Sequence, residues 1–356
     1  MKRNRLVLCL FVLLTLSFTG LGDACTTFRL PYDGGWVFGK NLDWMIEKGL
    51  VVVNKRNVFK MTGPEEESFT WTSKYGSVTF NMYGCGMPMG GVNEKGLVID
   101  NMWLRETTYP EPDSRPGLSE LQWVQYQLDT AETVDDVIAS DSKVRIGSDY
   151  GAPLHFLIAD GKGGSAVIEF LDGEMVYHKG ENLPVTALTN TVYKDCLDFM
   201  ASYAGEDTSA AYRETAFSRA RFMTAAERVE AFDPKESGSP VDYALATLDS
   251  VSNEATQWSI VYDPMKTRVY FRTKSNRNIR YIDLGAFDYS CESPVKVFDM
   301  SAGEAGDVSD EFIDYSYEAN YDLVEHSFSK TPFLKDTPVE FFRTIARYPE
   351  AMRCVE

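Results

Sequence analysis

A cysteine at position 25 is the residue of this chain best placed for catalysis. It follows a stretch with the features of an export signal, because residues 1–24 start with basic side chains, continue with an apolar run and end in small residues. Removal of the signal makes Cys25 the first residue of the mature chain. Its free α-amine, with an ordinary pKa of about 8, then lies beside the thiol and can serve as the general base. We therefore predict that Cys25 is a nucleophile that needs no histidine.

Two other interpretations of Cys25 stay open. A lipoprotein signal also ends directly before a cysteine, and acylation of that cysteine would block the amine. Such signals usually carry Leu three residues upstream, where this chain has Gly22. Alternatively, Cys25 is an ordinary buried cysteine of a strand. The apolar run within residues 1–24 is too short to span a bilayer, and no later stretch predicts a transmembrane segment.

A lysine and an aspartate follow Cys25 at a distance that a hairpin can close. The runs Thr26–Leu30 and Trp36–Phe38 are typical of strands, and an Asp-Gly-Gly sequence between them predicts a turn. Pairing of these strands would bring Lys40 and Asp43 back beside Cys25. A cation lowers the pKa of a thiol, and a carboxylate can hold the new terminal ammonium. Taken alone, a pair of this kind is more often found on a solvated surface.

The overall charge argues against nucleic acid and anionic membranes as partners. The chain has 35 Lys and Arg against 53 Asp and Glu, a net charge of −18. Removal of residues 1–24 takes away three basic side chains and one acidic one and makes the charge about −20. The five remaining cysteines have no CxxC spacing, which predicts neither a disulfide framework nor a zinc site. We expect those other than Cys25 to be small buried side chains, with one disulfide left open. The three histidines also lack metal-site spacing, so we expect no metal.

The elements that would position these residues come in an order typical of an α+β protein. Blocks of strands and helices alternate without a strict βαβ repeat. Beyond the first two strands, strand patterns cover Leu50–Val53, Ser68–Thr72, Ser77–Asn81, Leu97–Asn101, Leu154–Ala159, Ala166–Leu171, Met175–His178, Trp258–Tyr262 and Val269–Arg272. Helical patterns cover Ser119–Leu128, Thr133–Ala139, Ala216–Ala231 and Val241–Val251. The acidic stretch Gly303–Asp322 has a weaker pattern, and we interpret it as a surface excursion.

Several motifs occur in the order and at the distances found in one known family. They are the cysteine at the mature terminus, GKNLDW at 39–44, GVNEKGLVIDNMW at 91–103 and LTN at 188–190. In these motifs the chain resembles the choloylglycine hydrolases, a family of N-terminal-nucleophile hydrolases that includes bile salt hydrolases and penicillin V acylases. The resemblance implies an αββα sandwich, with two antiparallel sheets between helical layers. It further implies that residues 25–356 form a single domain and that no cofactor is needed.

The resemblance also assigns roles to three residues. Cys25 matches the nucleophile of the family, and Asp43 matches the aspartate that orients the terminal amine. Asn190 matches the asparagine whose side-chain amide helps to form the oxyanion hole. Loss of such a donor commonly costs on the order of 3 kcal/mol of transition-state stabilisation. Without the resemblance, Asn190 would be interpreted as a turn residue.

At three points the chain departs from the family pattern. Lys40 stands where the family generally carries Arg, so a single ammonium replaces a planar fork. Trp103 stands where relatives carry Asn or Tyr. Its backbone N–H is a candidate oxyanion donor, and its ring, with that of Trp44, is a candidate wall of an apolar acyl pocket, although both rings can equally be core. The family's catalytic arginine precedes Phe at the start of a helix; Arg221 keeps that step, and Arg219 is the alternative and a candidate for substrate binding.

Together these expectations predict an exported hydrolase of linear amides, either periplasmic or secreted. Its partner is a small-molecule amide, which Cys25 would cleave through a thioester. The resemblance offers bile salts, phenoxyacetyl penicillins and N-acyl homoserine lactones as substrates, and similarity to Gram-negative bile salt hydrolases favours bile salts. A homotetramer is a family expectation only. The alternative from another class is a non-catalytic surface lipoprotein that is lipidated at Cys25.

Overall fold

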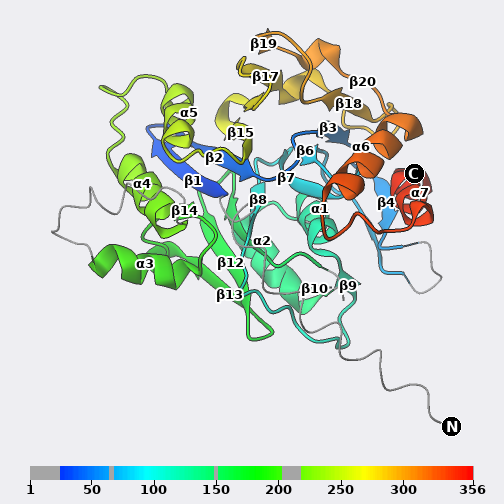
Figure 1. Cartoon of the computed structure of the whole chain (residues 1–356), viewed down its shortest axis with the longest axis horizontal. Coiled ribbons are helices and arrows are strands. Elements are labelled where there is room, and N and C mark those ends of the chain that lie inside the picture. Colours follow the sequence, from blue (N-terminus) through cyan, green and yellow to red (C-terminus); the bar gives the residue numbers. More distant parts are fainter. Residues whose placement is uncertain (1–24, 64–67, 148–150, 203–217, 356) are drawn as a thin grey trace.

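The structure is a computed structural model that describes residues 25–63, 68–147, 151–202 and 218–355. The expected signal at 1–24, and the first two residues of the helix expected at 216–231, lie outside these ranges. Figure 1 shows β-sheets in the middle of the molecule and helices on their outer sides.

The first sheet has seven strands and carries the N-terminal hairpin. Its strands, in spatial order, are β14 (Ala187–Leu188), β1 (Thr26–Tyr32), β2 (Gly35–Asp43), β15 (Thr256–Asp263), β16 (Arg268–Thr273), β17 (Arg280–Asp283) and β19 (Gly306–Asp307). All neighbours are antiparallel except β17 and β19, which pair in parallel.

The second sheet has nine strands, all paired antiparallel. Its strands, in spatial order, are β13 (Glu174–Lys179), β12 (Ser165–Leu171), β11 (Leu154–Ala159), β8 (Val98–Trp103), β7 (Pro88–Asn93), β6 (Ser77–Asn81), β3 (Leu50–Asn54), β18 (Lys296–Asp299) and β20 (Ile313–Asp314). Two small sheets complete the fold, formed by β21 (Arg353–Cys354), β4 (Val58–Met61) and β5 (Thr70–Thr72), and by β9 (Gly117–Leu118) and β10 (Arg145–Ile146).

Helices cover the outer faces of both large sheets. The helices are α1 (Glu120–Thr130), α2 (Val134–Ala139), α3 (Tyr193–Ser202), α4 (Ser218–Glu230), α5 (Pro240–Ser250), α6 (Tyr317–Lys330) and α7 (Val339–Arg347). Helices α4 and α5 pack on strands of the first sheet, whereas α1 packs on β7 and β8 of the second. The α+β class and the αββα sandwich expected from the sequence are therefore confirmed.

The largest hydrophobic core fills the space between the two sheets. The ring of Phe80 on β6 lies 5.9 Å from Tyr262 on β15 and 6.0 Å from Phe271 on β16, both edge to face. A second core lies beneath α1, where the rings of Trp123 and Phe156 are 4.7 Å apart. Each fully buried ring of this size stabilises the fold by about 1.5–3 kcal/mol. The interior between the sheets is thus tightly packed, and polar groups within it need partners.

Strand β7 is an element that the sequence pattern does not predict. Gly90 and Gly91 lie at its centre, and glycine has low strand propensity. Both glycines are closely approached in the sheet. A Cβ at Gly90 would lie 2.4 Å from Oδ2 of Asp100, and one at Gly91 would lie 2.6 Å from the carbonyl oxygen of Val78. Glycine is therefore required here to leave room for neighbouring groups.

The surface excursion expected over Gly303–Asp322 is wrong from Tyr317 onward. Helix α6 begins at Tyr317, capped by the side chain of Ser316, which accepts from the N–H of Ala319 at 3.1 Å. Its residue Asn320 is fully buried and accepts from the N–H of Cys85 at 2.8 Å. The acidic side chains of this stretch had hidden an amphipathic helix from a reading of charge alone.

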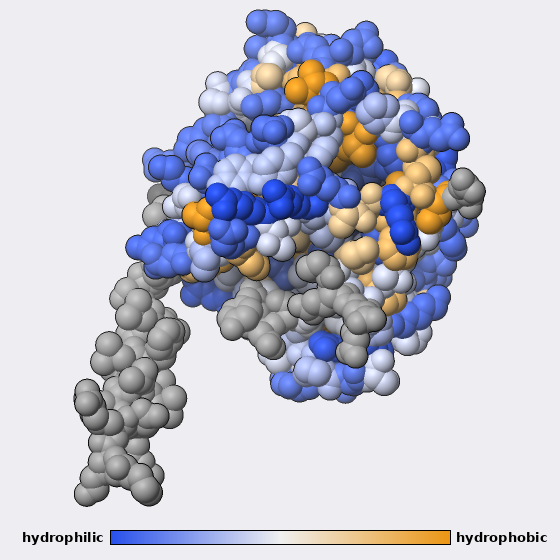
Figure 2. All heavy atoms as spheres, turned by 90° about the vertical axis from the view of Figure 1, so that its right-hand side faces the viewer, coloured by the Kyte–Doolittle hydropathy of each residue, from blue (hydrophilic) through white to orange (hydrophobic). Residues whose placement is uncertain are grey.

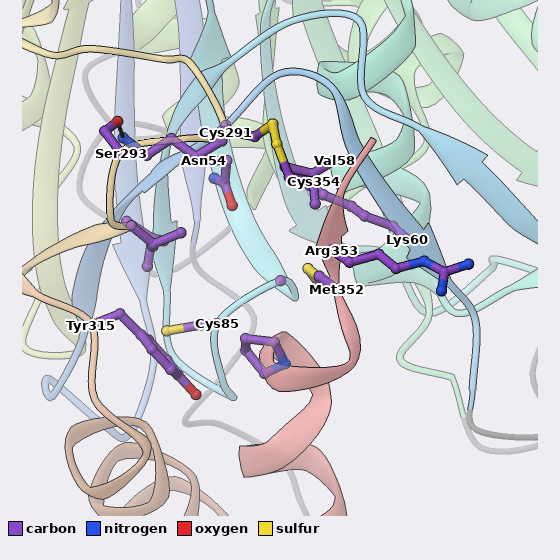
Figure 3. Close-up of a pocket in the computed structure, with 15 residues that line it drawn as sticks. Asn54, Val58, Lys60, Cys85, Cys291, Ser293, Tyr315, Met352, Arg353 and Cys354 are labelled. Carbon is purple, nitrogen blue, oxygen red and sulfur yellow. Dashed lines mark hydrogen bonds between the residues drawn. A yellow bond between two sulfur atoms is a disulfide. The ribbon is translucent and has the colours of Figure 1, made fainter. Parts of the chain in front are cut away.

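The cysteines fall into two groups. Cys85 and Cys196 are buried free thiols, as expected. Cys291 and Cys354 form a disulfide across a separation of 63 residues, which is the one disulfide that the sequence had left open. The bond joins the C-terminal strand β21 to the loop before β18, beside a cavity of about 230 Å³ (Figure 3).

One face of the molecule exposes hydrophobic side chains among polar ones, as Figure 2 shows from the side of α6 and α7. In this C-terminal region Phe333, Val339 and Phe341 are exposed, Phe333 by 60% of its surface. Within the ranges that the structure describes, no helix is both long and apolar enough to cross a membrane.

Candidate active site

Cys25 lies at the start of β1, beside the end of β2. The hairpin expected from the Asp-Gly-Gly turn forms, with Thr26 opposite Asn41 and Thr27 opposite Lys40. This register brings Asp43 next to Cys25. The N–H of Asp43 donates to Sγ of Cys25 at 3.4 Å, and the thiol lies 3.7 Å from the carbonyl oxygen of Asp43. Cys25 is 4% exposed, so these contacts hold the sulfur in a dry site.

Opposing influences act on the thiol of Cys25. Burial raises its pKa, because a thiolate loses solvation in the interior. The ammonium of Lys40 lowers it, the carboxylate of Asp43 raises it, and the guanidinium of Arg221 lowers it again. The net direction is upward. While Cys25 remains linked to residue 24, its nitrogen is an amide, so no terminal ammonium assists ionisation.

Asp43 is fully buried and only partly satisfied. Its Oδ2 accepts from Nδ2 of Asn253 at 3.1 Å, whereas Oδ1 has no hydrogen-bond partner among the described residues. Burial raises the pKa of Asp43 to about 6, against the lowering effects of Thr256 and Arg221. A buried carboxylate oxygen without a donor is costly, and a new cation beside it would remove that cost.

Lys40 is held in a buried ion pair. Its Nζ lies 3.0 Å from Oδ1 of Asp100, and it also donates to the carbonyl oxygen of Asn101. Tyr262 donates to the other carboxylate oxygen of Asp100 at 3.2 Å. Burial lowers the pKa of Lys40, but Asp100 and Cys25 raise it, and the net shift is upward. Lys40 is therefore a fixed positive charge close to the thiol, and not a surface residue.

Asn190 is oriented by contacts at both ends of its amide. Its Oδ1 accepts from Arg221 at 3.1 Å, and its Nδ2 donates to the carbonyl oxygen of Trp103 at 2.9 Å. Because Oδ1 faces a cation that can only donate, the placement of the amide nitrogen is determined. One hydrogen of Nδ2 serves Trp103, which leaves the second for a substrate oxygen. Strand β14 places Asn190 here, because Leu188 pairs with Thr27 of β1.

The structure separates the two candidate arginines. Arg221 is fully buried on the inner face of α4, and it donates to Oγ1 of Thr26 at 3.3 Å and towards the carbonyl oxygen of Cys25 at 3.5 Å. Arg219 is exposed, lies 3.8 Å from a carboxylate oxygen of Asp195 and stacks over a phenylalanine ring. The structure therefore brings Arg221, and not Arg219, together with Cys25 and Asn190.

Three aromatic rings gather next to these polar groups. The rings of Trp44 and Trp103 are 5.9 Å apart, and each lies 6.4 Å from the ring of Phe333. The indole N–H of Trp44 donates to the hydroxyl of Tyr83 at 2.8 Å, which fixes its ring. Trp44 follows Asp43, and the carbonyl of Trp103 contacts Asn190. Both tryptophans are only partly buried, so their rings border the site and do not belong to the deep core.

Comparison with known proteins gives this arrangement a family. The family model of linear amide C–N hydrolases of the choloylglycine hydrolase type matches residues 25–224, more than half of the chain. The chain belongs to the choloylglycine hydrolase family. It is accordingly a hydrolase of linear amide C–N bonds, as the sequence motifs had implied.

Among known choloylglycine hydrolases, penicillin V acylases are similar over most of the chain. The penicillin V acylase of Pectobacterium atrosepticum is 27% identical over 340 residues, which covers 81% of this chain and 89% of that protein. The structure of penicillin V acylase from Agrobacterium tumefaciens is 25% identical, with a TM-score of 0.69 over 82% of this chain and 98% of that one. A conjugated bile acid hydrolase from Clostridium perfringens shares the fold, with 17% identity and a TM-score of 0.67, covering 79% of this chain and 98% of that chain.

Some residues of this choloylglycine hydrolase site escape sequence reasoning. Asp100 and Asn101 lie inside the motif at 91–103. Two polar residues within an apolar strand indicate buried polar groups that need partners, so the sequence could have pointed to them. Asn253 and Phe333 carry no local signal, because only the fold brings them to the site. Among the described residues, no group of three or more His, Cys, Asp or Glu side chains is arranged to hold a metal.

Proposed function

We propose that this chain hydrolyses amides whose acyl part is aromatic or otherwise planar and apolar, with phenoxyacetyl amides such as penicillin V as the favoured class. The observation that carries the proposal is the cluster of Trp44, Trp103 and Phe333, in which Trp44 follows Asp43 and the carbonyl of Trp103 contacts Asn190. Rings at this separation can stack on or edge towards an aryl group, at about 0.5–1.5 kcal/mol per contact beyond simple burial. The likeness to two penicillin V acylases supports the same class.

The proposed reaction uses Cys25 as its nucleophile. The thiol transfers its proton to the α-amine of Cys25, and the thiolate adds to the amide carbonyl. The oxyanion receives hydrogen bonds from Nδ2 of Asn190 and from a backbone N–H near Trp103. The C–N bond then breaks as the α-ammonium returns a proton to the leaving amine. Water attacks the thioester next, so that the acid is released and the thiol is restored.

Removal of residues 1–24 is part of this proposal, because the reaction needs a free α-amine on Cys25. The buried Oδ1 of Asp43 supports it, since an ammonium at Cys25 would supply the donor that this oxygen lacks. The family match also begins at Cys25. We propose on the same ground that the mature protein is periplasmic or secreted.

Bile salts are the second candidate substrate class. The sequence favours them, and the ring of Phe333 at the border of the aromatic cluster is 60% exposed, so an acyl group larger than phenoxyacetyl can extend past it into solvent. N-acyl homoserine lactones are a further class to include in the assay. The aromatic cluster itself favours a flat aryl group, because its three rings offer faces and edges on several sides.

The test is a panel assay on the secreted protein with penicillin V, glycocholate, taurocholate and an acyl homoserine lactone, which measures release of the free amine. We expect the largest kcat/KM for penicillin V and loss of all activity in Cys25→Ala. Intact-mass measurement should give an unmodified chain that starts at Cys25. Unchanged activity in Cys25→Ala would rule out the mechanism, and a diacylglyceryl mass would favour the lipoprotein alternative. A higher kcat/KM for glycocholate would overturn the substrate assignment alone.

A further inference from the structure

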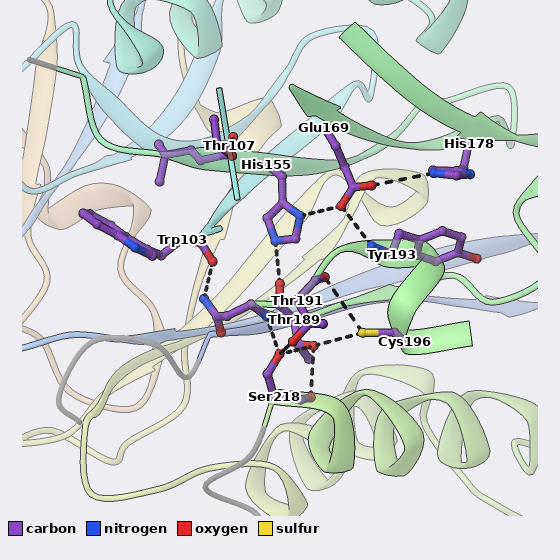
Figure 4. A network of polar contacts seen from close by, with 12 residues as sticks. Trp103, Thr107, His155, Glu169, His178, Thr189, Thr191, Tyr193, Cys196 and Ser218 are labelled. Carbon is purple, nitrogen blue, oxygen red and sulfur yellow. Dashed lines mark hydrogen bonds and ion pairs between the residues drawn. The ribbon is translucent and has the colours of Figure 1, made fainter. Parts of the chain in front are cut away.

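A buried histidine and a buried glutamate lie behind the site, outside the groups that the proposed reaction uses. His155 on β11 and Glu169 on β12 are both fully buried in neighbouring strands of the second sheet. Nδ1 of His155 lies 3.1 Å from Oε1 of Glu169, and Figure 4 shows the two side chains pointing toward each other. Tyr193, at the start of α3, donates its N–H to the same carboxylate oxygen at 2.9 Å. Burying two such groups needs a compensating role or compensating contacts.

The second nitrogen of His155 reaches across to the other sheet. Its Nε2 lies 2.6 Å from the carbonyl oxygen of Thr189, directly after β14. A carbonyl oxygen can only accept, so Nε2 carries a hydrogen. Burial raises the pKa of Glu169, but His155, His178 and the N–H of Tyr193 outweigh it and lower that pKa to about 2, so the carboxylate is ionised. Nδ1 faces that carboxylate at 3.1 Å, so the imidazole of His155 is held at both of its nitrogens.

The peptide group between Thr189 and Asn190 is held at both its oxygen and its N–H. The carbonyl of the Thr189–Asn190 peptide accepts from His155, and its N–H donates to Oγ of Ser218 at 2.8 Å. Ser218 also donates to Oγ1 of Thr189 at 2.9 Å, while that hydroxyl donates to the carbonyl of Ser218 at 3.0 Å. Ser218 begins α4, the helix that carries Arg221. Fixing the oxygen and the N–H of a planar peptide fixes the position of the next Cα, that of Asn190.

We propose that His155, Glu169 and Ser218 form a clamp on the Thr189–Asn190 peptide and are positioning residues for Asn190, the oxyanion donor. The inference rests on the function proposed above. Its physical basis is that a donor aids the transition state only when aimed at the oxyanion, and that a misplacement of about 1 Å can cost a factor on the order of a hundred in rate. The imidazole of His155 joins a carboxylate of the second sheet to the carbonyl of Thr189 through two short polar contacts, and such a bridge resists displacement of that peptide.

The test removes the clamp without leaving a buried charge. The double substitution His155→Leu with Glu169→Gln removes the imidazole and the carboxylate together, so no buried carboxylate is left without its partner. We expect kcat for penicillin V, or for glycocholate if that is hydrolysed faster, to fall about tenfold to a hundredfold, while KM stays within about threefold. Ser218→Ala should act in the same direction. His326→Gln, a histidine on α6 outside the clamp, should leave both constants unchanged.

A double-mutant cycle distinguishes positioning from general destabilisation. Asn190→Ala alone should lower kcat by a factor on the order of a hundred or more. In the Asn190→Ala background the clamp substitutions should change kcat by less than about twofold, because nothing remains to be positioned. An equal loss of kcat in both backgrounds, or no loss in a folded variant, would overturn the proposal. If the double substitution does not fold, Ser218→Ala decides on the same criterion.

The cycle also distinguishes this inference from the proposed function. Unchanged kcat in Asn190→Ala would remove the oxyanion role itself. A large loss in Asn190→Ala together with additive effects of the clamp substitutions would leave the reaction in place and overturn only the clamp.

Discussion

At the scale of single residues, Asp43 links chain processing to stability. Its pKa of about 6 lies above the ordinary value, because burial without enough donors disfavours the carboxylate. A raised pKa means that the folded chain holds the proton more tightly than the unfolded chain. The stabilising contribution is therefore present below about pH 4 and is lost as pH rises through about 6. In the chain that retains residue 24, ionisation of Asp43 at neutral pH therefore lowers the free energy of unfolding.

We expect Asp43→Asn to stabilise the unprocessed chain at pH 7.5 and to abolish activity after processing. The gain in unfolding free energy should be on the order of 3 kcal/mol, the equivalent of about two pKa units, and should vanish near pH 4. Chemical denaturation at both pH values measures it. In the chain that starts at Cys25, where the ammonium can pair with Asp43, the same substitution should not stabilise. Equal gains in both forms would contradict the pairing.

Lys40 and Asp100 make a second prediction at this scale. Their side chains are 2% and 3% exposed, so removing one partner leaves a charge in the interior. We expect Lys40→Met to lower the unfolding free energy by about 3–5 kcal/mol and to reduce kcat, since Cys25 loses a nearby cation. Urea denaturation gives the first value. Adding Asp100→Asn should recover part of the stability but not the activity, and a loss below about 1 kcal/mol would contradict a buried pair.

At the scale of elements, the segment between α6 and α7 contributes to the site from far along the chain. It carries Phe333, which meets the rings of Trp44 and Trp103 although 60% of its surface is exposed. An exposed ring at a site border is free to contact a substrate. Trp44 directly follows β2 and Trp103 ends β8, so the two tryptophans are positioned by strands of different sheets. The aromatic cluster therefore combines two rings that strands position, those of Trp44 and Trp103, with the ring of Phe333 on a loop.

We expect Phe333→Ala to raise KM for penicillin V about threefold to tenfold with little change in kcat, because it removes contact with the acyl group and not with the reacting atoms. Steady-state kinetics on the mature protein measure both constants. Phe341→Ala is the matched control, since this phenylalanine is 49% exposed on α7 and should leave KM unchanged. A fall in kcat without a change in KM would count against a binding role.

The sequence predicts those parts of the fold and site that depend on local pattern. The β1–β2 hairpin, the capped helix α1 and the strands around Val98–Trp103 follow from turn residues and periodicity. Strand β7 and helix α6 do not follow from local pattern. The glycines of β7 are required by close neighbouring groups, and α6 is fixed by contacts with distant parts of the chain. The same limit applies to the site. Motifs indicate Cys25 and Asp43, whereas the partners of His155 become visible only when the two sheets face each other.

At the scale of the whole molecule, one covalent bond fastens the C-terminal end. The Cys291–Cys354 disulfide closes a long loop that contains α6, α7 and the segment with Phe333. Structural disulfides persist in oxidising compartments, which agrees with the proposal that the protein is exported. Strand β21 also pairs with β4, through Arg353 and Phe59. The C-terminal region is thus attached to the rest of the protein by a disulfide and by the backbone pairing of β21 with β4.

We expect replacement of Cys291 and Cys354 by serine to lower the unfolding free energy by about 4 kcal/mol, the loop-entropy value for a closure of this length. Urea denaturation should show the same loss for the unmodified protein in reductant. Kcat should hold, because the bond lines the cavity in Figure 3, and none of Cys25, Asp43, Asn190 and Arg221 lines that cavity. Loss of kcat in a variant that remains folded would contradict this separation.

The place of Phe333 in the chain has a consequence for how such proteins diversify. The region matched by the family ends at residue 224, and Phe333 lies beyond it. Substitutions in this short stretch, where Phe333 is 60% exposed, can therefore change the contacts with an acyl group while Cys25, Asp43 and Asn190 stay as they are. Mutations there have little core packing to disturb, so drift and selection can explore many variants at small risk to folding.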